Sequence, residues 1–123
     1  MRILCVDDDL DTRDLLEHLV SFSDLEIICV KDTAAALLLI EKEQFSLYII
    51  DGELPGVSGL GLCEEIRKRD PRTPIIIYSG HAYASDREAG RLAGADVYLV
   101  KPYIDEIVPT VKHLLEEGRA TNS

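Results

Sequence analysis

Five short runs of apolar residues recur along the chain, separated by longer segments with helical periodicity. Nearly continuous apolar runs of four to six residues predict strands buried on both faces, as in a parallel sheet covered by helices. The alternation of five such strands with five helices predicts one α/β domain with helices on both faces. The predicted strands are Ile3 to Val6, Leu25 to Val30, Leu47 to Ile50, Ile75 to Tyr78 and Val97 to Val100.

Capping residues predict where the helices begin and end. The Asp70-Pro71 pair should end the third helix, and Gly118 should lie just past the fifth with a positive φ. A fifth helix that begins near Asp105 or Glu106 places Pro109 in its first turn. The caps expected for the first four helices are Asp9 or Asp11, Asp32 or Thr33, Ser58, and Ser85 with Glu88 in capping-box spacing.

Composition narrows the class of protein. A chain of 123 residues with 46% hydrophobic content suits a single domain with one core. The net charge of −10, without a basic stripe, argues against direct nucleic-acid binding. The apolar runs are too short to span a membrane and no charged-then-apolar leader is present, so we expect a soluble cytoplasmic protein.

The cysteines and histidines do not show the spacing typical of a metal site. Cys5, Cys29 and Cys63 are odd in number and widely spaced, so we expect reduced thiols packed as small hydrophobic residues. The three histidines lack the ligand spacing of a zinc site. His81 stands apart from the others, because it follows a predicted strand at the loop edge.

Charged residues follow three of the predicted strands. Asp7 and Asp8 come after the first strand, Asp51 after the third and Lys101 after the fifth. In a parallel sheet these carboxyl ends meet at one edge, where ligand crevices form. Crowded carboxylates repel one another unless a cation neutralises them, and Mg²⁺ suits carboxylate and phosphate oxygens. The cluster therefore predicts metal-dependent phosphate chemistry.

Each motif taken alone also has an ordinary structural explanation. An acidic triplet is typical of a helix-capping loop, and Ser79-Gly80 and Lys101-Pro102 are typical of turns. The peptide bond before Pro102 can be cis, which would aim Lys101 inward. Asp51 is the strongest single signal, because an apolar strand leads directly to it and a turn-rich loop, Gly52 to Gly56, leaves its carboxylate accessible.

Together, the motifs resemble the response-regulator receiver domain of two-component signalling. The resemblance covers about residues 1–118 and leaves 119–123 as a tail or the start of a linker. It implies a flavodoxin-like receiver fold with five parallel strands in the order 2-1-3-4-5. The matching segments are Val6-Asp7-Asp8-Asp9, Asp51, Leu54-Pro55-Gly56 with Gly59, Ser79-Gly80, Ala93-Gly94-Ala95-Asp96, and Tyr98 to Pro102.

The resemblance also implies a chemistry. Asp51 would accept a phosphoryl group from the phosphohistidine of a sensor histidine kinase or histidine phosphotransferase. Mg²⁺ would be bound by Asp8, Asp51 and the backbone carbonyl of Glu53, with Asp7 acting largely through water. Lys101 would pair with the phosphoryl oxygens. Such a domain is a regulatory phosphoacceptor rather than an enzyme, with self-phosphorylation and autodephosphorylation only.

Signal output is implied by the same resemblance. Ser79 would hydrogen-bond the phosphoryl group, and Tyr98 would turn from outside to inside. The face made by the fourth helix, fifth strand and fifth helix would then control a downstream effector or output domain, or drive formation of a homodimer. The kinase, the partner and the pathway do not follow from the sequence.

The chain departs from the family pattern beside the phosphoacceptor. Gly52 stands where an apolar residue is usual, and Glu53 where an uncharged one is common. Glu53 and His81 occupy the variable positions that flank the site. We hypothesise that an anionic Glu53 alters the lifetime of the phosphorylated state by repelling phosphate or ordering water. The alternative is that Glu53 points into solvent and only its carbonyl matters.

Three other functions are compatible with parts of the pattern. A magnesium-dependent aspartyl phosphohydrolase also has an aspartate-rich loop after the first strand, but Asp7, Asp9 and Asp11 lack the rest of its signature. A flavin-binding module would need hydroxyls and glycines in that loop instead of carboxylates. A pseudo-receiver would bind partners without phosphorylation, which the complete set of site residues disfavours.

Overall fold

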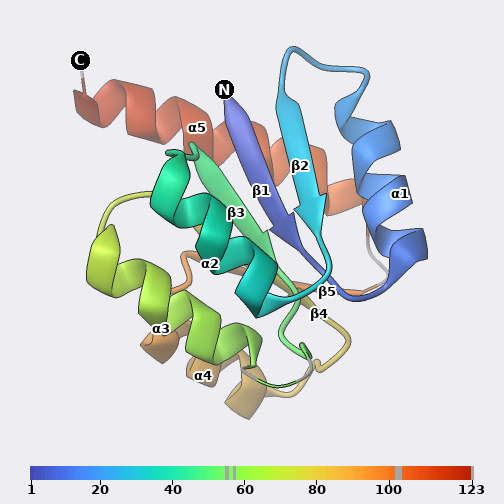
Figure 1. The fold of residues 1–123 in the computed structure, drawn as a ribbon, viewed down its shortest axis with the longest axis vertical. Coiled ribbons are helices and arrows are strands. Elements are labelled where there is room, and N and C mark those ends of the chain that lie inside the picture. Colours follow the sequence, from blue (N-terminus) through green and yellow to red (C-terminus); the bar gives the residue numbers. More distant parts are fainter. Residues whose placement is uncertain (55, 57, 102–103, 123) are drawn as a thin grey trace.

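The computed structural model describes residues 1–54, 56, 58–101 and 104–122. Five strands and five α-helices alternate along these residues (Figure 1). The strands are β1 (Arg2–Val6), β2 (Glu26–Val30), β3 (Leu47–Ile50), β4 (Ile75–Ser79) and β5 (Val97–Val100). The α-helices are α1 (Leu10–Val20), α2 (Thr33–Lys42), α3 (Gly59–Arg69), α4 (Ala84–Ala93) and α5 (Ile107–Asn122), the last preceded by a 3-10 turn, Ile104–Glu106.

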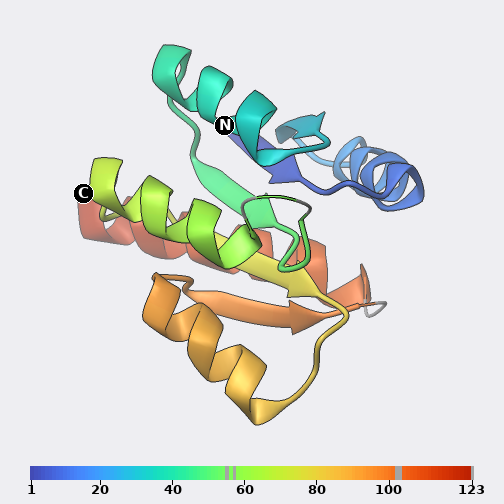
Figure 2. The ribbon, with the colours of Figure 1, turned by 60° about the horizontal axis from the view of Figure 1, so that its bottom comes forward.

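The strands form one parallel sheet in the order β2-β1-β3-β4-β5, as predicted. Each strand arrowhead in Figure 2 points toward the same edge of the sheet. That edge therefore collects the residues that follow the strands. β1 pairs with β3, and the last residues of the two strands, Val6 and Ile50, lie opposite each other. This register brings the residues that follow both strands side by side.

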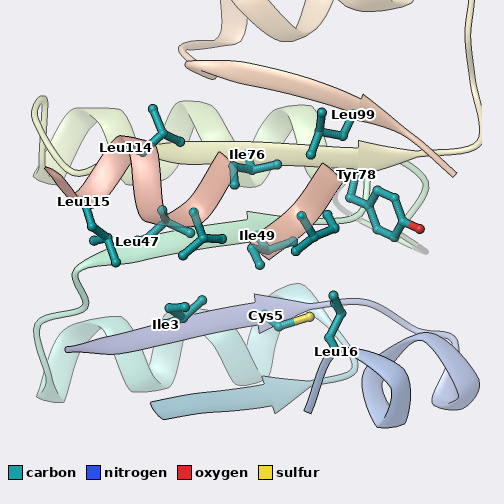
Figure 3. Close-up of a cluster of buried hydrophobic side chains, with 12 residues drawn as sticks. Ile3, Cys5, Leu16, Leu47, Ile49, Ile76, Tyr78, Leu99, Leu114 and Leu115 are labelled. Atoms are coloured by element: carbon teal, nitrogen blue, oxygen red, sulfur yellow. The ribbon is translucent and has the colours of Figure 1, made fainter. Parts of the chain in front are cut away.

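Helices cover both faces of the sheet, which explains why the strands are continuously apolar. Ile3 and Cys5 of β1 point toward α1 and α5, whereas Leu4 and Val6 point toward the face of α2, α3 and α4, and all four are fully buried. Figure 3 shows the first of these two cores, in which α5 contributes Leu114 and Leu115. The edge strand β2 is only partly buried. Its exposed first residue, Glu26, fits that position.

Most of the predicted helix boundaries are confirmed. Asp9 caps α1 by accepting hydrogen bonds from the backbone N and the Oγ1 of Thr12, at 3.3 and 2.6 Å. Asp32 and Ser58 cap α2 and α3 by accepting from the backbone N of Ala35 and of Gly61. Helix α3 ends at Arg69, before the Asp70-Pro71 pair.

Two helix boundary predictions are wrong. Helix α4 begins one residue before Ser85, and its first turn is closed by Asp86, which accepts from the backbone N of Tyr83 at 3.1 Å. Glu88 instead binds the guanidinium of Arg91. Gly118 does not follow α5 but lies inside it, because the helix continues to Asn122. A glycine costs a helix only about 1 kcal/mol relative to alanine, which the continuing hydrogen-bond ladder offsets.

Some of the sequence predictions are not tested by the structure. Pro55 and Pro102, including the expected effect of a cis bond before Pro102, fall outside the described residues. The division of the chain at residue 118 stays a prediction.

The helices of the described residues are each too short or too polar to cross a membrane. Cys5 and Cys63 are buried, as predicted for cysteines that pack as small hydrophobic residues, whereas Cys29 is only partly buried.

Arg67 ties together three elements at the edge opposite the predicted site. Its guanidinium donates to the backbone oxygens of Gly94 and Thr73 at 2.8 and 2.6 Å, and to Oδ2 of Asp96 at 2.7 Å. The same Asp96 oxygen accepts from the backbone N of Ile75 at 2.8 Å. This network anchors the C-terminal end of α4 to α3 and to the start of β4. The other end of α4 follows the loop that begins after Ser79.

Candidate functional site

Backbone hydrogen bonds continue the sheet past the strand ends and set the positions of the site residues. The backbone N of Asp7 donates to the carbonyl of Val30 at 3.0 Å, and that of Asp51 donates to Val6 at 2.8 Å. On the other side, the backbone N of Lys101 donates to the carbonyl of Ser79 at 2.8 Å. Three segments distant in sequence thus enter one edge in fixed register.

Asp7, Asp8 and Asp51 converge at this edge. One carboxylate oxygen from each lies within 4.8 Å of the other two. Asp7 and Asp51 are almost completely buried, at 2% and 3% exposure, whereas Asp8 is exposed. The third member of the acidic triplet, Asp9, is used to cap α1. The structure therefore separates the three consecutive aspartates into a pair at the cluster and a helix cap.

Lys101 reaches into the acidic cluster from the end of β5. Its Nζ lies 2.9 Å from Oδ2 of Asp7 and 3.6 Å from Oδ2 of Asp51. Burial by itself lowers the lysine pKa, but the hydrogen bond and charge of Asp7, helped by Asp51, outweigh it and raise the pKa above its ordinary value. Lys101 is consequently a cation that neutralises part of the cluster.

Asp51 is electrostatically unusual. Burial raises its pKa to about 6, and the charge of Asp7 adds to that shift. A hydrogen bond from the backbone N of Glu53, at 3.0 Å to Oδ1, and the charge of Lys101 act in the opposite direction. Ionisation of the Asp51 carboxyl group therefore costs more free energy in the folded protein than in water. A cation bound at the cluster would relieve that cost.

The start of α3 packs against the backbone of Asp51. A Cβ built on Gly59 would lie only 1.9 Å from the carbonyl oxygen of Asp51. No side chain fits there, so only glycine lets the helix begin so close to the strand end. Gly59 was predicted as part of a loop motif, but its direct contact with Asp51 arises only in the folded chain.

Glu53, Ser79 and His81 form a second polar group beside the acidic cluster. The buried hydroxyl of Ser79 donates to Oε1 of Glu53 at 3.2 Å. Nε2 of His81 lies 3.4 Å from the same oxygen. Gly52 leaves the room that Ser79 occupies, because a Cβ there would lie 3.0 Å from the serine Oγ. The alternative in which the Glu53 side chain points only into solvent is therefore not the arrangement found.

Tyr98 connects β5 to the loop between β4 and α4. Its hydroxyl donates to the backbone oxygen of His81 at 2.7 Å. The ring lies against Gly90, where a Cβ would come within 2.9 Å of Cδ2 of the tyrosine, and the guanidinium of Arg87 lies 6.0 Å from the ring centroid. The predicted switch pair, Ser79 and Tyr98, is thus joined through one short loop.

Arg13 is a contributor that the sequence patterns did not single out. From the first turns of α1, its Nη1 donates to the backbone oxygen of Asp7 at 2.8 Å. This contact fixes the loop that carries the acidic pair. The sequence gives little indication of this role, because Arg13 reaches Asp7 only once α1 has folded against the end of the sheet.

The donor set fits Mg²⁺. Three carboxylates within ligand distance of one another, two of them buried, present the hard oxygen atoms that this ion prefers. Burial, with a contribution from the charge of Asp7, raises the pKa of Asp51 despite Lys101, so a bound cation would favour its ionised form. The predicted contribution of the Glu53 carbonyl and the water-mediated role of Asp7 stay predictions.

Comparison with known proteins gives a consistent family. A family model described as the response regulator receiver domain matches residues 3–112. The uncharacterized transcriptional regulatory protein YrkP of Bacillus subtilis is 38% identical over 85% of this chain and 45% of its own. Response regulator MprA of Mycobacterium leprae is 33% identical over 97% of this chain and 53% of its own. The chain spans about half the length of these curated relatives.

Solved structures agree with that family. A response regulator receiver domain protein from Methanospirillum hungatei has a TM-score of 0.91 and 30% identity, covering 98% of this chain and 97% of its own. Response regulator protein TrrA from Thermotoga maritima, solved in complex with Mg(2+)-BeF, has a TM-score of 0.82 and 36% identity over 92% of this chain and 97% of its own. The chain belongs to the response regulator receiver domain family of two-component systems, whose members are regulatory rather than classical enzymes.

Proposed function

We propose that this domain accepts a phosphoryl group on Asp51 from the phosphohistidine of a sensor histidine kinase or histidine phosphotransferase. The observation that carries the proposal is the pairing of a buried carboxylate with a cation and two further carboxylates. Asp51 lies 3.6 Å from Nζ of Lys101 and within 4.8 Å of oxygens from Asp7 and Asp8. A purely structural role would not require this concentration of charge at a strand end.

The proposed reaction is a displacement at phosphorus. A carboxylate oxygen of Asp51 forms a bond to phosphorus while the bond to the histidine nitrogen breaks, which leaves an acyl phosphate on the domain and an imidazole on the donor. Lys101, already beside Asp51, pairs with the incoming phosphoryl oxygens. Asp7, Asp8 and Asp51 are the residues that would hold Mg²⁺, which would supply positive charge for the phosphoryl oxygens.

Output would follow from a change of partner at Ser79. In the present structure its hydroxyl is bonded to Glu53. A phosphoryl group on Asp51 would compete for this hydroxyl, and the neighbouring loop would carry the change to Tyr98 through the His81 backbone oxygen. The face of α4, β5 and α5 would then control a downstream effector, an output domain or a homodimer. The transcriptional regulators among the relatives support an output of this kind.

Glu53 and His81 would set how long the phosphorylated state lasts. They meet beside Ser79, and Oε1 of Glu53 is the atom that both contact. A carboxylate at this position repels a phosphoryl group and can orient water for hydrolysis of the acyl phosphate. It also competes with the phosphoryl group for the Ser79 hydroxyl.

Phosphorylation by a small donor tests the proposal. The wild type and Asp51→Asn are incubated with Mg²⁺ and acetyl phosphate, and their intact masses are measured. We expect an added phosphoryl group on the wild type and none on Asp51→Asn. Asp14→Asn, which removes an exposed carboxylate from α1, is the matched control and should be phosphorylated normally. Absence of the adduct from the wild type would favour the pseudo-receiver, and turnover of a phosphomonoester would favour the phosphohydrolase.

A further inference from the structure

Two of the three cysteines are neighbours on adjacent strands. Cys5 of β1 and Cys29 of β2 are directly paired in the parallel register. Paired residues of adjacent parallel strands have their Cα atoms about 4.8 Å apart and point to the same face. That spacing lies within the range found for disulfide-bonded cysteines. The neighbouring Cys29 thiol and burial raise the pKa of Cys5, and neither cysteine is in a disulfide.

The two thiols differ in access to solvent. Cys5 is fully buried under α1 and α5, and Figure 3 shows its sulfur beside Leu16. Cys29 lies on the edge strand and is partly exposed. Its Sγ is 3.9 Å from the backbone oxygen of Arg13 in α1. Cys29 is therefore the more accessible of the two residues, and Cys5 lies directly beside it.

Cys63 provides an internal comparison. It is a buried thiol on α3, packed in the core on the other face of the sheet. The sheet therefore separates Cys63 from the other two cysteines. Among the residues described, Cys63 has no other cysteine on its face of the sheet.

We propose that Cys5 and Cys29 form a reversible thiol-oxidation site that closes to a disulfide when the protein meets hydrogen peroxide. The Cys29 sulfur attacks the peroxide, the O–O bond breaks, and a sulfenic acid and one water are produced. The Cys5 sulfur then attacks the Cys29 sulfur, and hydroxide leaves and takes the Cys5 proton as a second water. Two thiols are oxidised by two electrons, and the peroxide is reduced.

The position of the pair gives its oxidation a structural consequence. The bond would link β2 covalently to β1 one residue before their last pair, Val6 with Val30. The next backbone contact along these strands is the hydrogen bond from Asp7 to Val30. Oxidation would thus restrain the edge strand directly beside the loop that carries the acidic pair. This inference does not depend on phosphorylation of Asp51.

Peptide mapping after peroxide treatment tests the inference. The folded, reduced protein is treated with hydrogen peroxide, alkylated in denaturant and digested with trypsin. We expect an intact mass lower by two hydrogens, alkylation of Cys63 only, and a cross-linked pair of peptides, residues 3–13 with 14–31. Dithiothreitol should restore three alkylated cysteines. The same oxidation in urea should lose this selectivity and produce links to Cys63 as well.

Single variants identify the order of the steps. Cys29→Ser should yield no cross-link, and Cys5→Ser should leave a sulfenic acid on Cys29 that dimedone traps. Cys63→Ser should cross-link as the wild type does, and circular dichroism checks that each variant is folded. Full alkylation of all three cysteines in peroxide-treated wild type, direct oxidation of Cys29 to sulfinic acid, or disulfides only between chains would each overturn the inference.

Discussion

The hydroxyl of Ser79 donates a hydrogen bond to Oε1 of Glu53 across 3.2 Å. Ser79 is the residue that we propose binds the phosphoryl group, so in this structure a carboxylate occupies the place of that partner. His81 approaches the same oxygen at 3.4 Å. The unphosphorylated state is therefore stabilised by a contact that phosphorylation would have to replace.

Removing this carboxylate should prolong the phosphorylated state. Glu53→Met frees the Ser79 hydroxyl and removes a negative charge beside the phosphoryl group. A hydrogen bond to a charged group contributes about 1.5 kcal/mol, so we expect dephosphorylation to slow by about tenfold. The decay of the phosphorylated form is followed by intact mass after removal of the donor.

Two further variants separate the effects. His81→Ala should change the decay rate less, because the exposed imidazole approaches Ser79 only through Glu53. The direct hydrogen bond to Ser79 comes from the backbone N of residue 81, which alanine retains. Glu64→Met, at an exposed position of α3, is the matched control and should decay as the wild type does. Unchanged rates in both Glu53→Met and His81→Ala would refute a role for this pair in the lifetime.

Asp51 should make the metal-free protein less stable as pH rises. Burial raises its pKa to about 6 from an ordinary value near 3.8, so the folded state binds the proton more tightly than the unfolded state. The stabilisation is complete below pH 4 and is lost as pH rises through 6. Two pKa units correspond to about 3 kcal/mol.

Comparison with Asp51→Asn isolates this contribution. Urea unfolding is measured in EDTA between pH 4 and 7.5 for both proteins. We expect the variant to become more stable relative to the wild type by about 3 kcal/mol over this range. A constant difference across the range would contradict the raised pKa. Added Mg²⁺ should stabilise the wild type more at pH 7.5 than at pH 4.5, because a protonated Asp51 is a poor ligand.

Gly59→Ala should displace the phosphoacceptor. The new Cβ would lie 1.9 Å from the Asp51 carbonyl oxygen, so the start of α3 or the end of β3 must move. Overpacking of this kind costs about 1–3 kcal/mol of unfolding free energy, and we expect phosphorylation by acetyl phosphate to slow as well. Glu64→Ala, at an exposed position of the same helix, is the control, and its stability and phosphorylation should match or exceed the wild type.

Arg67→Met should destabilise the fold. The guanidinium makes hydrogen bonds to Gly94, Thr73 and Asp96, and the arginine side chain is only 18% exposed. Methionine retains part of the aliphatic packing but leaves these acceptors without their donor, at a cost of about 2–4 kcal/mol. Arg69→Met is the matched control, since Arg69 only pairs with Glu41 across 3.7 Å at the surface and should cost under about 0.5 kcal/mol. Equal midpoints of urea unfolding would refute the role of Arg67.

The strand pattern and the identity of the site residues can be predicted from the sequence. Continuous apolar runs favour strands that helices cover on both faces, so Leu47–Ile50 and Val97–Val100 are predicted with their observed bounds. The residues that follow parallel strands must share one edge. The convergence of Asp7, Asp51 and Lys101 therefore follows from topology as soon as the strands are known to be parallel.

The start of α4 and the end of α5 cannot be predicted in this way. Ser85 and Gly118 carry the usual signals of a helix start and a helix end, but local signals compete with others nearby. Asp86 closes the first turn of α4 instead, and α5 continues through Gly118. Which signal prevails depends on the free energy of the whole helix in its packed position.

Strand periodicity and chain order are local properties, so the order of amino acids is enough to specify which side chains this edge of the sheet holds. How those side chains pair depends on the folded chain: Lys101 lies closer to Asp7 than to Asp51, and Glu53 turns onto Ser79. The pairing of Cys5 with Cys29 was decided there as well. Such contacts join residues from different elements, and strand register and side-chain packing set them only when all the elements are in place.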